Sequence, residues 1–168
     1  MEAKETAAIA VRESGISALQ LAPDSRLNER RWGAFTGVTD MGVPILFPEE
    51  AAKIARQGEW RHRPPAGSDG RSGESRRDLM RRLRPFMHDV FAQAEGENLL
   101  VITHSEVILC ARKILEGLTE AQGQAMNEQQ RVPNCSVTSY LAKGKRLVRE
   151  RAYFVASKSV VFQSAPSP

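Results

Sequence analysis

An apolar run that ends on a histidine is the feature that most restricts the fold of this chain. The run covers 99–103 (LLVIT) and is followed by His104, after which apolar residues recur at helical spacing over 107–116. A short apolar run bounded by polar turn residues is typical of a buried strand, so we predict a strand, a turn and a helix in this order. Ligands of open α/β sheets bind at the carboxyl ends of strands. The pattern therefore places His104 where such a fold carries out its chemistry.

The rest of the chain divides into helices, short strands and loops. We predict helices over 3–13, 48–58 and 75–93 and a short one from Thr119, strands over 18–23, 135–141 and 147–155, and loops over 24–40 and 64–73. Strands separated by helices predict an α/β fold of three layers, with a mostly parallel sheet flanked by helices. The last two strands form a hairpin through 143–145 and add an antiparallel edge. We expect one domain over 1–156 and a partly disordered tail over 157–168.

Composition favours a globular enzyme-sized domain. The chain has 168 residues, of which 41% are hydrophobic, and this is enough to bury a sizeable core. The sequence contains no run of about 18 apolar residues that could span a membrane, and residues 1–11 lack the order of a secretory signal. Cys110 and Cys135 are isolated in the sequence, so we expect two free thiols in the protein core and no metal site. Reduced thiols favour the cytoplasm as the location. We expect no cofactor.

Positive charge is concentrated in arginines. The 24 basic residues exceed the 20 acidic ones by four. A solvated helix face explains most of this excess, and attraction of anionic substrates or of nucleic acid is the alternative. Few aromatic residues lie between the arginines, so nucleic-acid binding is not expected. The cluster comprises Arg71, Arg76, Arg77, Arg81, Arg82 and Arg84, with Arg61 and Arg63 ahead of it.

Three short segments hold the residue types that chemistry needs. They are 26–33 (RLNERRWG), 73–75 (GES) with Asp78 one turn later, and 103–106 (THSE). Each one alone has a structural explanation: a surface ion-pair cluster, a helix start and a structural histidine. Their combination and order carry more information than any one of them.

In this order the segments resemble the histidine phosphatase superfamily, also called the phosphoglycerate mutase-like family. RLNERRWGAFTG is similar to the family loop L-x-E-x-x-x-G-x-x-(E/T)-G, and most of all to its form in cofactor-dependent phosphoglycerate mutases. NLLVITHSEVILCARKILEGL resembles the strand–(S/T)HG–helix unit, and VPNCSVTSY resembles the N-x-S-V strand. FPEEAAKIARQGEW, followed by RPP and GES, is similar to the phosphatase half of the bifunctional fructose-2,6-bisphosphate enzyme. The resemblance extends to about Tyr153.

The resemblance implies a phosphatase of small phosphate esters that acts through a phosphohistidine intermediate. Glu29 would be its general acid and base, and His104 would donate a hydrogen bond to the phosphoryl oxygens. A phosphoglycerate mutase-type phosphotransferase is the alternative within the family. The expected phosphate- and substrate-binding set consists of the backbone N–H groups of Ser105 and Glu106 at a helix start, the guanidinium groups of Arg30, Arg61 and Arg63, and Asn134.

Several positions depart from the family pattern. The family's nucleophile belongs to an R-H-G string at the end of the first strand, and this string is absent from the sequence. The nearest string, 61–63 (RHR), precedes Pro64 and follows a charged helix, so it is no substitute. Glu2 replaces an expected arginine, and Ser105 replaces a glycine. We therefore expect a domain that is incomplete at its N-terminus and lacks the family's first strand. We expect the chain as written to be inactive.

A non-catalytic fragment or pseudoenzyme is the second class of function that these departures leave open. Without the first strand, the edges of 18–23 and 99–103 should be unpaired or paired with each other. Open edges favour association, so a homodimer is expected.

Overall fold

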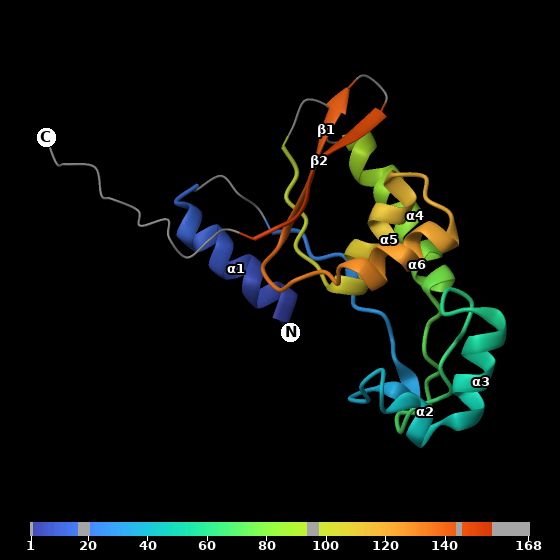
Figure 1. The fold of residues 1–168 in the computed structure, drawn as a ribbon. Coiled ribbons are helices and arrows are strands. Elements are labelled where there is room, and N and C mark those ends of the chain that lie inside the picture. The colour runs from blue at the N-terminus through green and yellow to red at the C-terminus, as the bar shows by residue number, and fades with distance from the viewer. Residues whose placement is uncertain (1, 17–20, 94–97, 144–145, 156–168) are drawn as a thin grey trace, which may run out of the picture.

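Helices are the main regular structure of the molecule in the computed structural model (Figure 1). The structure describes residues 2–16, 21–93, 98–143 and 146–155. The elements are α1 (Glu2–Ser14), the 3₁₀ turns η1 (Ser25–Leu27) and η2 (Gly33–Phe35), α2 (Val43–Leu46), α3 (Pro48–Gln57), α4 (Arg76–Gln93), α5 (Ser105–Leu115), α6 (Glu120–Gln129), β1 (Val137–Lys143) and β2 (Arg146–Phe154). Within these ranges, no helix is both long and apolar enough to cross a bilayer.

The core lies where α4 packs on α5. The spacing of the sequence places Leu79, Leu83, Phe86, Val90 and Phe91 on one face of α4, and the first three are buried. Phe91, near the end of the helix, is exposed. The buried cluster consists of Trp60, Leu79, Met80, Leu83, Val107, Leu109 and Cys110. This helix pair is the packed part of the molecule on which the site is built.

The predicted late hairpin is present. β1 and β2 pair antiparallel, with Tyr140 opposite Arg149 and Lys143 opposite Arg146. Residues 144–145 of the hairpin turn and the predicted tail 157–168 lie outside the described residues. The first strand begins at Val137 rather than at 135. Cys135 is the reason, because its φ of 57° belongs to a turn and not to a strand. Cys135 is also exposed, so its expected place in the core was wrong.

The predicted parallel sheet is not formed by the described residues. Their one sheet is the β1–β2 hairpin, so the chain combines helices with a small antiparallel sheet. Residues 98–104 are not a strand, and the side chains of Leu99, Leu100 and Val101 are exposed. The same holds for 21–23 of the predicted strand 18–23, whereas 18–20 lie outside the described residues. A strand exists only with a hydrogen-bonding partner, and neither 98–104 nor 21–23 has one among the described residues.

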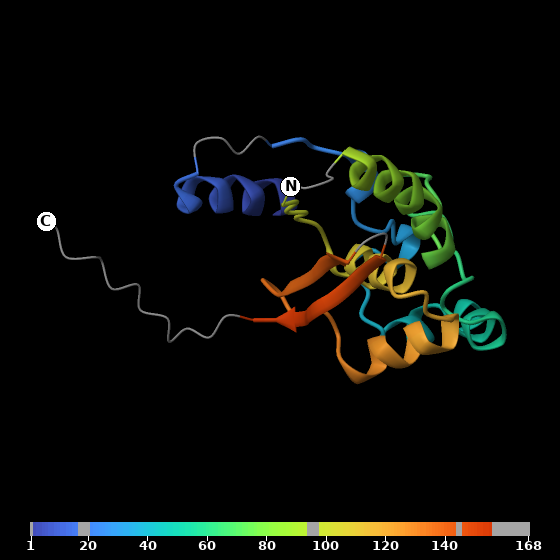
Figure 2. The ribbon, with the colours of Figure 1, turned by 90° about the horizontal axis from the view of Figure 1, so that it is seen from above.

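One end of the segment 98–104 is nevertheless fixed. The Thr103 hydroxyl donates to the Leu27 carbonyl over 2.8 Å, so the segment is anchored just before α5 begins. Helix α1 lies apart from α4, α5 and α6 in both views (Figures 1 and 2). The fold therefore holds the start of α5 in place and leaves the apolar residues ahead of it in solvent.

We expect the segment 98–101 to drive self-association. Leu100 is 67% exposed, so a Leu100→Lys variant loses little packing and adds a charge that opposes strand pairing. Size-exclusion chromatography with light scattering should show concentration-dependent association of the wild type that this variant reduces. Its melting temperature should not change. Ile45→Lys replaces an α2 residue that is 77% exposed; it is the control and should not reduce association. A wild type that stays monomeric at every concentration would show that the segment is covered in another way.

Candidate functional site

The structure brings Glu29 and His104 together. His104 precedes α5 with extended φ and ψ angles of −108° and 165°, and Glu29 lies in the loop that follows η1. The His104 Nδ1 atom is 4.0 Å from Glu29 Oε2, and both side chains are partly exposed. The two residues, 75 positions apart in the sequence, thus form a solvent-accessible acid–imidazole pair.

Helix α5 begins two residues earlier than predicted, directly at the pair. The Ile108 N–H donates to the His104 carbonyl over 3.0 Å, which starts the helical ladder there. No side chain caps this end. The first-turn N–H groups of Ser105, Glu106 and Val107 consequently have no acceptor within the helix. Together with the positive end of the helix dipole they can receive an anion next to His104.

Glu29 has the property that a proton donor needs. Burial raises the pKa of its carboxyl group, while the hydrogen bond from the Arg30 backbone N–H and attraction to His104 act in the opposite direction. The Arg30 N–H lies 2.8 Å from Glu29 Oε1. A raised pKa keeps a fraction of the carboxyl protonated closer to neutral pH, as general acid catalysis requires.

Arg30 and Glu106 form a buried ion pair beneath this surface. Arg30 Nη1 is 3.2 Å from Glu106 Oε2, and Arg30 Nε donates to the Glu74 carbonyl over 2.7 Å. Arg76 binds both oxygens of Glu106, at 2.8 and 3.0 Å. Burial opposes ionisation of Glu106, but Arg76 and Arg30 outweigh it and the pKa is lowered. The side chains of Arg30 and Glu106 thus bind each other, and Glu106 faces the candidate site through its backbone.

The other predicted binding residues lie in separate contacts. Arg61 Nε is 3.5 Å from Glu120 Oε2, and Arg63 binds Asp78 Oδ2 over 2.7 and 3.1 Å. Asn134 is exposed in the turn before β1. In the described part of the chain, no hydrogen bond or ion pair joins these residues to Glu29 or His104.

The remaining histidines are placed differently. His62 is buried, with Nε2 2.8 Å from Glu50 Oε2 and its ring stacked 5.7 Å from that of Phe35. His88 is on the exposed face of α4. In the described part of the chain, neither His62 nor His88 contacts Glu29 or His104. His104 is therefore the imidazole of this site.

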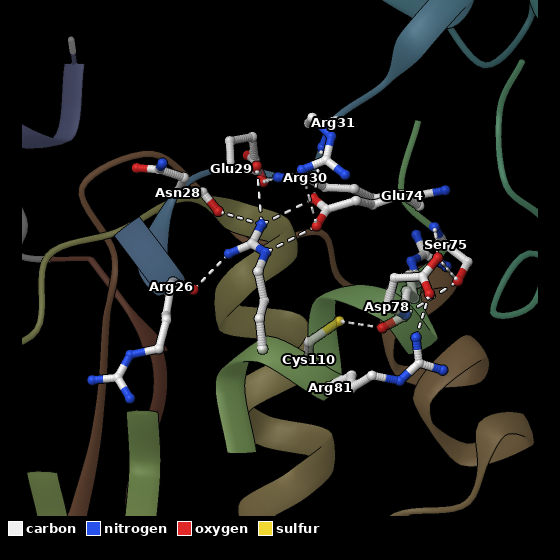
Figure 3. A network of polar contacts seen from close by, with 12 residues as sticks. Arg26, Asn28, Glu29, Arg30, Arg31, Glu74, Ser75, Asp78, Arg81 and Cys110 are labelled. Atoms are coloured by element: carbon white, nitrogen blue, oxygen red, sulfur yellow. Dashed lines mark hydrogen bonds and ion pairs between the residues drawn. The ribbon is translucent and has the colours of Figure 1, made fainter. Parts of the chain in front are cut away.

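Sequence reasoning missed Glu74, Arg76 and Arg82, the charged residues that hold the site. We interpreted Glu74 as a helix start and the arginines as a solvated face. The Glu74 and Arg76 side chains are buried, and the Arg82 side chain is 21% exposed. Figure 3 shows Glu74 facing the loop that carries Asn28–Arg31. A signal existed for Arg76, because it precedes Leu79 and Leu83 by three and seven residues and so lies on the apolar face.

Cys110 is a core thiol, as predicted. It is buried, and burial raises its pKa to about 12, so the reactive thiolate is scarce at neutral pH. The described residues contain no group of three or more His, Cys, Asp or Glu side chains arranged to hold a metal ion.

We expect the effect of Glu29 on stability to depend on pH. Its raised pKa means that the folded chain holds the proton more tightly than the unfolded chain does. This contribution is complete below the unfolded pKa of about 4.3 and is lost as pH rises through the folded pKa. A Glu29→Gln variant cannot ionise, so its melting temperature should rise relative to the wild type between pH 4 and pH 7. A melting-temperature difference that shrinks between pH 4 and pH 7 would show that the pKa of the Glu29 carboxyl is not raised in the folded chain.

Loss of the Glu106 carboxylate should destabilise the chain strongly. Glu106→Ala leaves Arg30 and Arg76 buried without their shared partner, which is expected to lower the free energy of unfolding by about 3–5 kcal/mol. Glu59 also binds Arg76, but its side chain is 44% exposed, so Glu59→Ala should lower it by less than about 1 kcal/mol. Urea denaturation of both variants measures the contrast. Equal effects would mean that Glu106 is not the central partner.

Known proteins match nearly the whole chain. The model of the histidine phosphatase superfamily (branch 1) matches residues 2–153. A 2,3-bisphosphoglycerate-dependent phosphoglycerate mutase of Methylobacterium radiotolerans is 27% identical over 165 residues, which are 97% of this chain and 69% of the relative. The mutase of the same name from Methylobacterium sp. strain 4-46 is 30% identical over 122 residues, which are 70% of this chain and 54% of the relative. The chain thus spans little more than half to about two thirds of these relatives.

Solved structures agree in fold. A mycobacterial glucosyl-3-phosphoglycerate phosphatase complexed with VO3 superimposes with a TM-score of 0.67 at 22% identity, over 89% of this chain and 71% of that one. For a structure described as mycobacterial hydrolase 2, the TM-score is 0.71 at 23% identity, over 94% and 69% of the two chains. At such identity these structures establish the fold alone. Because the family model covers residues 2–153, the chain belongs to the histidine phosphatase superfamily.

Proposed function

We propose that this chain provides the acid–base and anion-binding part of a site that cleaves small phosphate monoesters through a phosphohistidine intermediate. The observation that carries the proposal is the Glu29 carboxyl with its raised pKa, 4.0 Å from His104 and beside the open first turn of α5. Residues 1–156 would be the phosphatase-like domain.

Each group has a defined part in this chemistry. A nucleophilic imidazole attacks phosphorus, the ester P–O bond breaks, and Glu29 gives its proton to the leaving oxygen. Water then attacks phosphorus, the P–N bond breaks to free the imidazole and release phosphate, and the Glu29 carboxylate takes up a proton of the water. Throughout, His104 and the N–H groups of Ser105 and Glu106 stabilise the charge on the phosphoryl oxygens.

The rest of the substrate needs binding groups outside the Glu29–His104 pair. Arg61, Arg63 and Asn134 would hold a second anionic group of the substrate. The two arginines would first have to exchange Glu120 and Asp78 for that group. Arg30 would act through its contact with Glu106 and not as a free ligand, because its guanidinium is already bound on both sides.

The nucleophile is the missing part. The sequence holds no R-H-G string, and His62 is bound to Glu50 away from His104. We therefore expect the 168-residue chain alone to bind phosphate but not to turn over phosphate esters. The single His104 imidazole and the Glu29 carboxyl cannot both form a phosphohistidine and stabilise the charge of its phosphoryl group.

A phosphoglycerate mutase-type phosphotransferase is the second candidate. The loop 26–37 resembles that of the mutases, and the relatives at 27% and 30% identity carry the mutase name. Both candidates use the same pair of residues. They differ in the acceptor of the phosphoryl group, which is water for a phosphatase and a second hydroxyl for a mutase.

Titration of the chain with inorganic phosphate tests the binding part. We expect the NMR signals of the His104 ring and of the Ser105 and Glu106 amides to shift, and His104→Ala to weaken binding at least tenfold. His88→Ala, which removes an exposed histidine of α4, is the matched control and should bind like the wild type. Absence of any shift at α5 would rule out the proposed site.

Hydrolysis of p-nitrophenyl phosphate tests the catalytic part. The chain alone should remain at background rates, and a version extended upstream by a strand ending in R-H-G should hydrolyse it. In the extended version, His104→Ala should lower the rate about a hundredfold or more. Release of phosphate from 3-phosphoglycerate would favour the phosphatase, and isomerisation without release the mutase. Robust turnover by the 168-residue chain that His62→Ala abolishes would show that its nucleophile is His62.

A further inference from the structure

Arg82 of α4 binds the loop that carries Glu29 at three backbone carbonyls. Its Nη1 atom donates to the Arg26 carbonyl over 2.5 Å. Its Nη2 atom donates to the carbonyls of Asn28 and Glu29, at 2.7 and 3.1 Å. The hydrogen bonds between backbone atoms of the described residues do not use these three carbonyls. One side chain thus holds the loop backbone at three points up to and including Glu29.

Glu74 binds both Arg82 and the loop, and we call the contacts of Arg82 and Glu74 with the loop the clamp. Its carboxylate accepts from Arg82 Nε and Nη2 over 3.0 and 3.1 Å and from the Arg31 N–H over 3.1 Å. The Glu74 N–H donates to the Arg31 carbonyl over 2.8 Å. Burial opposes ionisation of Glu74, but Arg82 and Arg31 lower the pKa of the carboxyl. Figure 3 shows Glu74 and the labelled loop residues joined by these contacts.

We infer that Arg82 is a positioning residue for Glu29, with Glu74 as its partner, and that it holds the carboxyl at His104; the inference rests on the proposed role of Glu29. The loop has no strand or α-helix of its own between η1 and η2. The Glu29 carboxyl reaches His104 from this loop, so their distance depends on what fixes the loop backbone. Arg82 binds that backbone before and at Glu29, and its partner Glu74 binds it after Glu29, at Arg31.

The geometry requires arginine at this position. The five contacts come from three nitrogens of one planar group, and they reach acceptors on two different segments of the chain. A lysine has the same charge but carries its three donors on a single atom. It can reach Glu74 or the loop carbonyls, and it cannot hold both. Arg82→Lys thus removes the clamp without changing the net charge.

The experiment measures the pKa of the Glu29 carboxyl by NMR in the full chain. Release of the loop exposes Glu29 to water, so Arg82→Lys should shift this pKa downward by about half a unit or more, toward the ordinary value of about 4.3. Arg81→Lys is the matched control: Arg81 is the adjacent residue of α4 and binds Asp78 over 2.9 Å, away from the loop (Figure 3). It should leave the pKa of Glu29 unchanged.

A merely structural role of Arg82 would give a different result. Arg82→Lys would then lower the melting temperature while the pKa of Glu29 stays raised, and this outcome would overturn the inference. Glu74→Gln is the second variant, for use if Arg82→Lys does not fold. Its amide is uncharged and has one acceptor oxygen where the carboxylate has two, so it cannot keep both bonds to Arg82 Nε and Nη2, and the pKa of Glu29 should again fall. An unchanged value would equally overturn the inference.

The two proposals fail separately. If the wild type binds no phosphate at α5 but Arg82→Lys still lowers the pKa of Glu29, the proposed function is wrong and the positioning role stands. If phosphate binds and the pKa does not move in Arg82→Lys, the positioning role is wrong and the function stands.

Discussion

The buried ion pair between Arg76 of α4 and Glu106 of α5 is the interaction on which the rest of the site depends. It is bidentate, at 2.8 and 3.0 Å, and it joins the two helices of the core at the end where the site lies. Arg76 also lies over the Trp60 ring, 5.3 Å from its centroid. Glu106 in turn binds Arg30, so the same carboxylate connects the helix pair to the loop of Glu29. Buried charges need such complete partnering, because each one is costly to remove from water.

Local sequence patterns predicted the elements that depend on neighbours in the chain. The apolar periodicity of α4, the helix start at Pro48 and the late hairpin follow from spacing and turn residues, and the structure contains all three. Glu29 and His104, the residues to which the family resemblance assigns catalytic roles, lie 4.0 Å apart. Gly33 of the same motif has a structural reason. Its φ is +53°, and a Cβ atom there would come within 2.2 Å of the Pro65 carbonyl oxygen.

The elements that depend on distant partners could not be predicted in this way. The run 99–103 has the composition of a buried strand, but composition does not provide a partner. Among the described residues the run pairs with no strand, and 99–101 are exposed. Ion pairing is equally non-local. Arg76 and Arg82 belong to one arginine-rich stretch with Arg77 and Arg81. Arg76 is buried against Glu106 and Arg82 is half-buried against Glu74, whereas Arg77 and Arg81 are exposed. The sequence therefore predicts that Glu29 and His104 belong to one site more directly than it predicts the ion pairs that hold them.

The proximity of Glu29 and His104 in solution is the most direct thing to measure, because every proposed step uses it. Attraction to the His104 imidazole favours the ionised form of the Glu29 carboxyl and acts against the burial that raises its pKa. NMR titration of the Glu29 carboxyl in the wild type and in His104→Gln isolates this effect. The pKa of Glu29 should be higher in the variant, since the attraction is gone while the side-chain volume is largely kept. The same pKa in both proteins would place the two residues apart and remove the basis of the site.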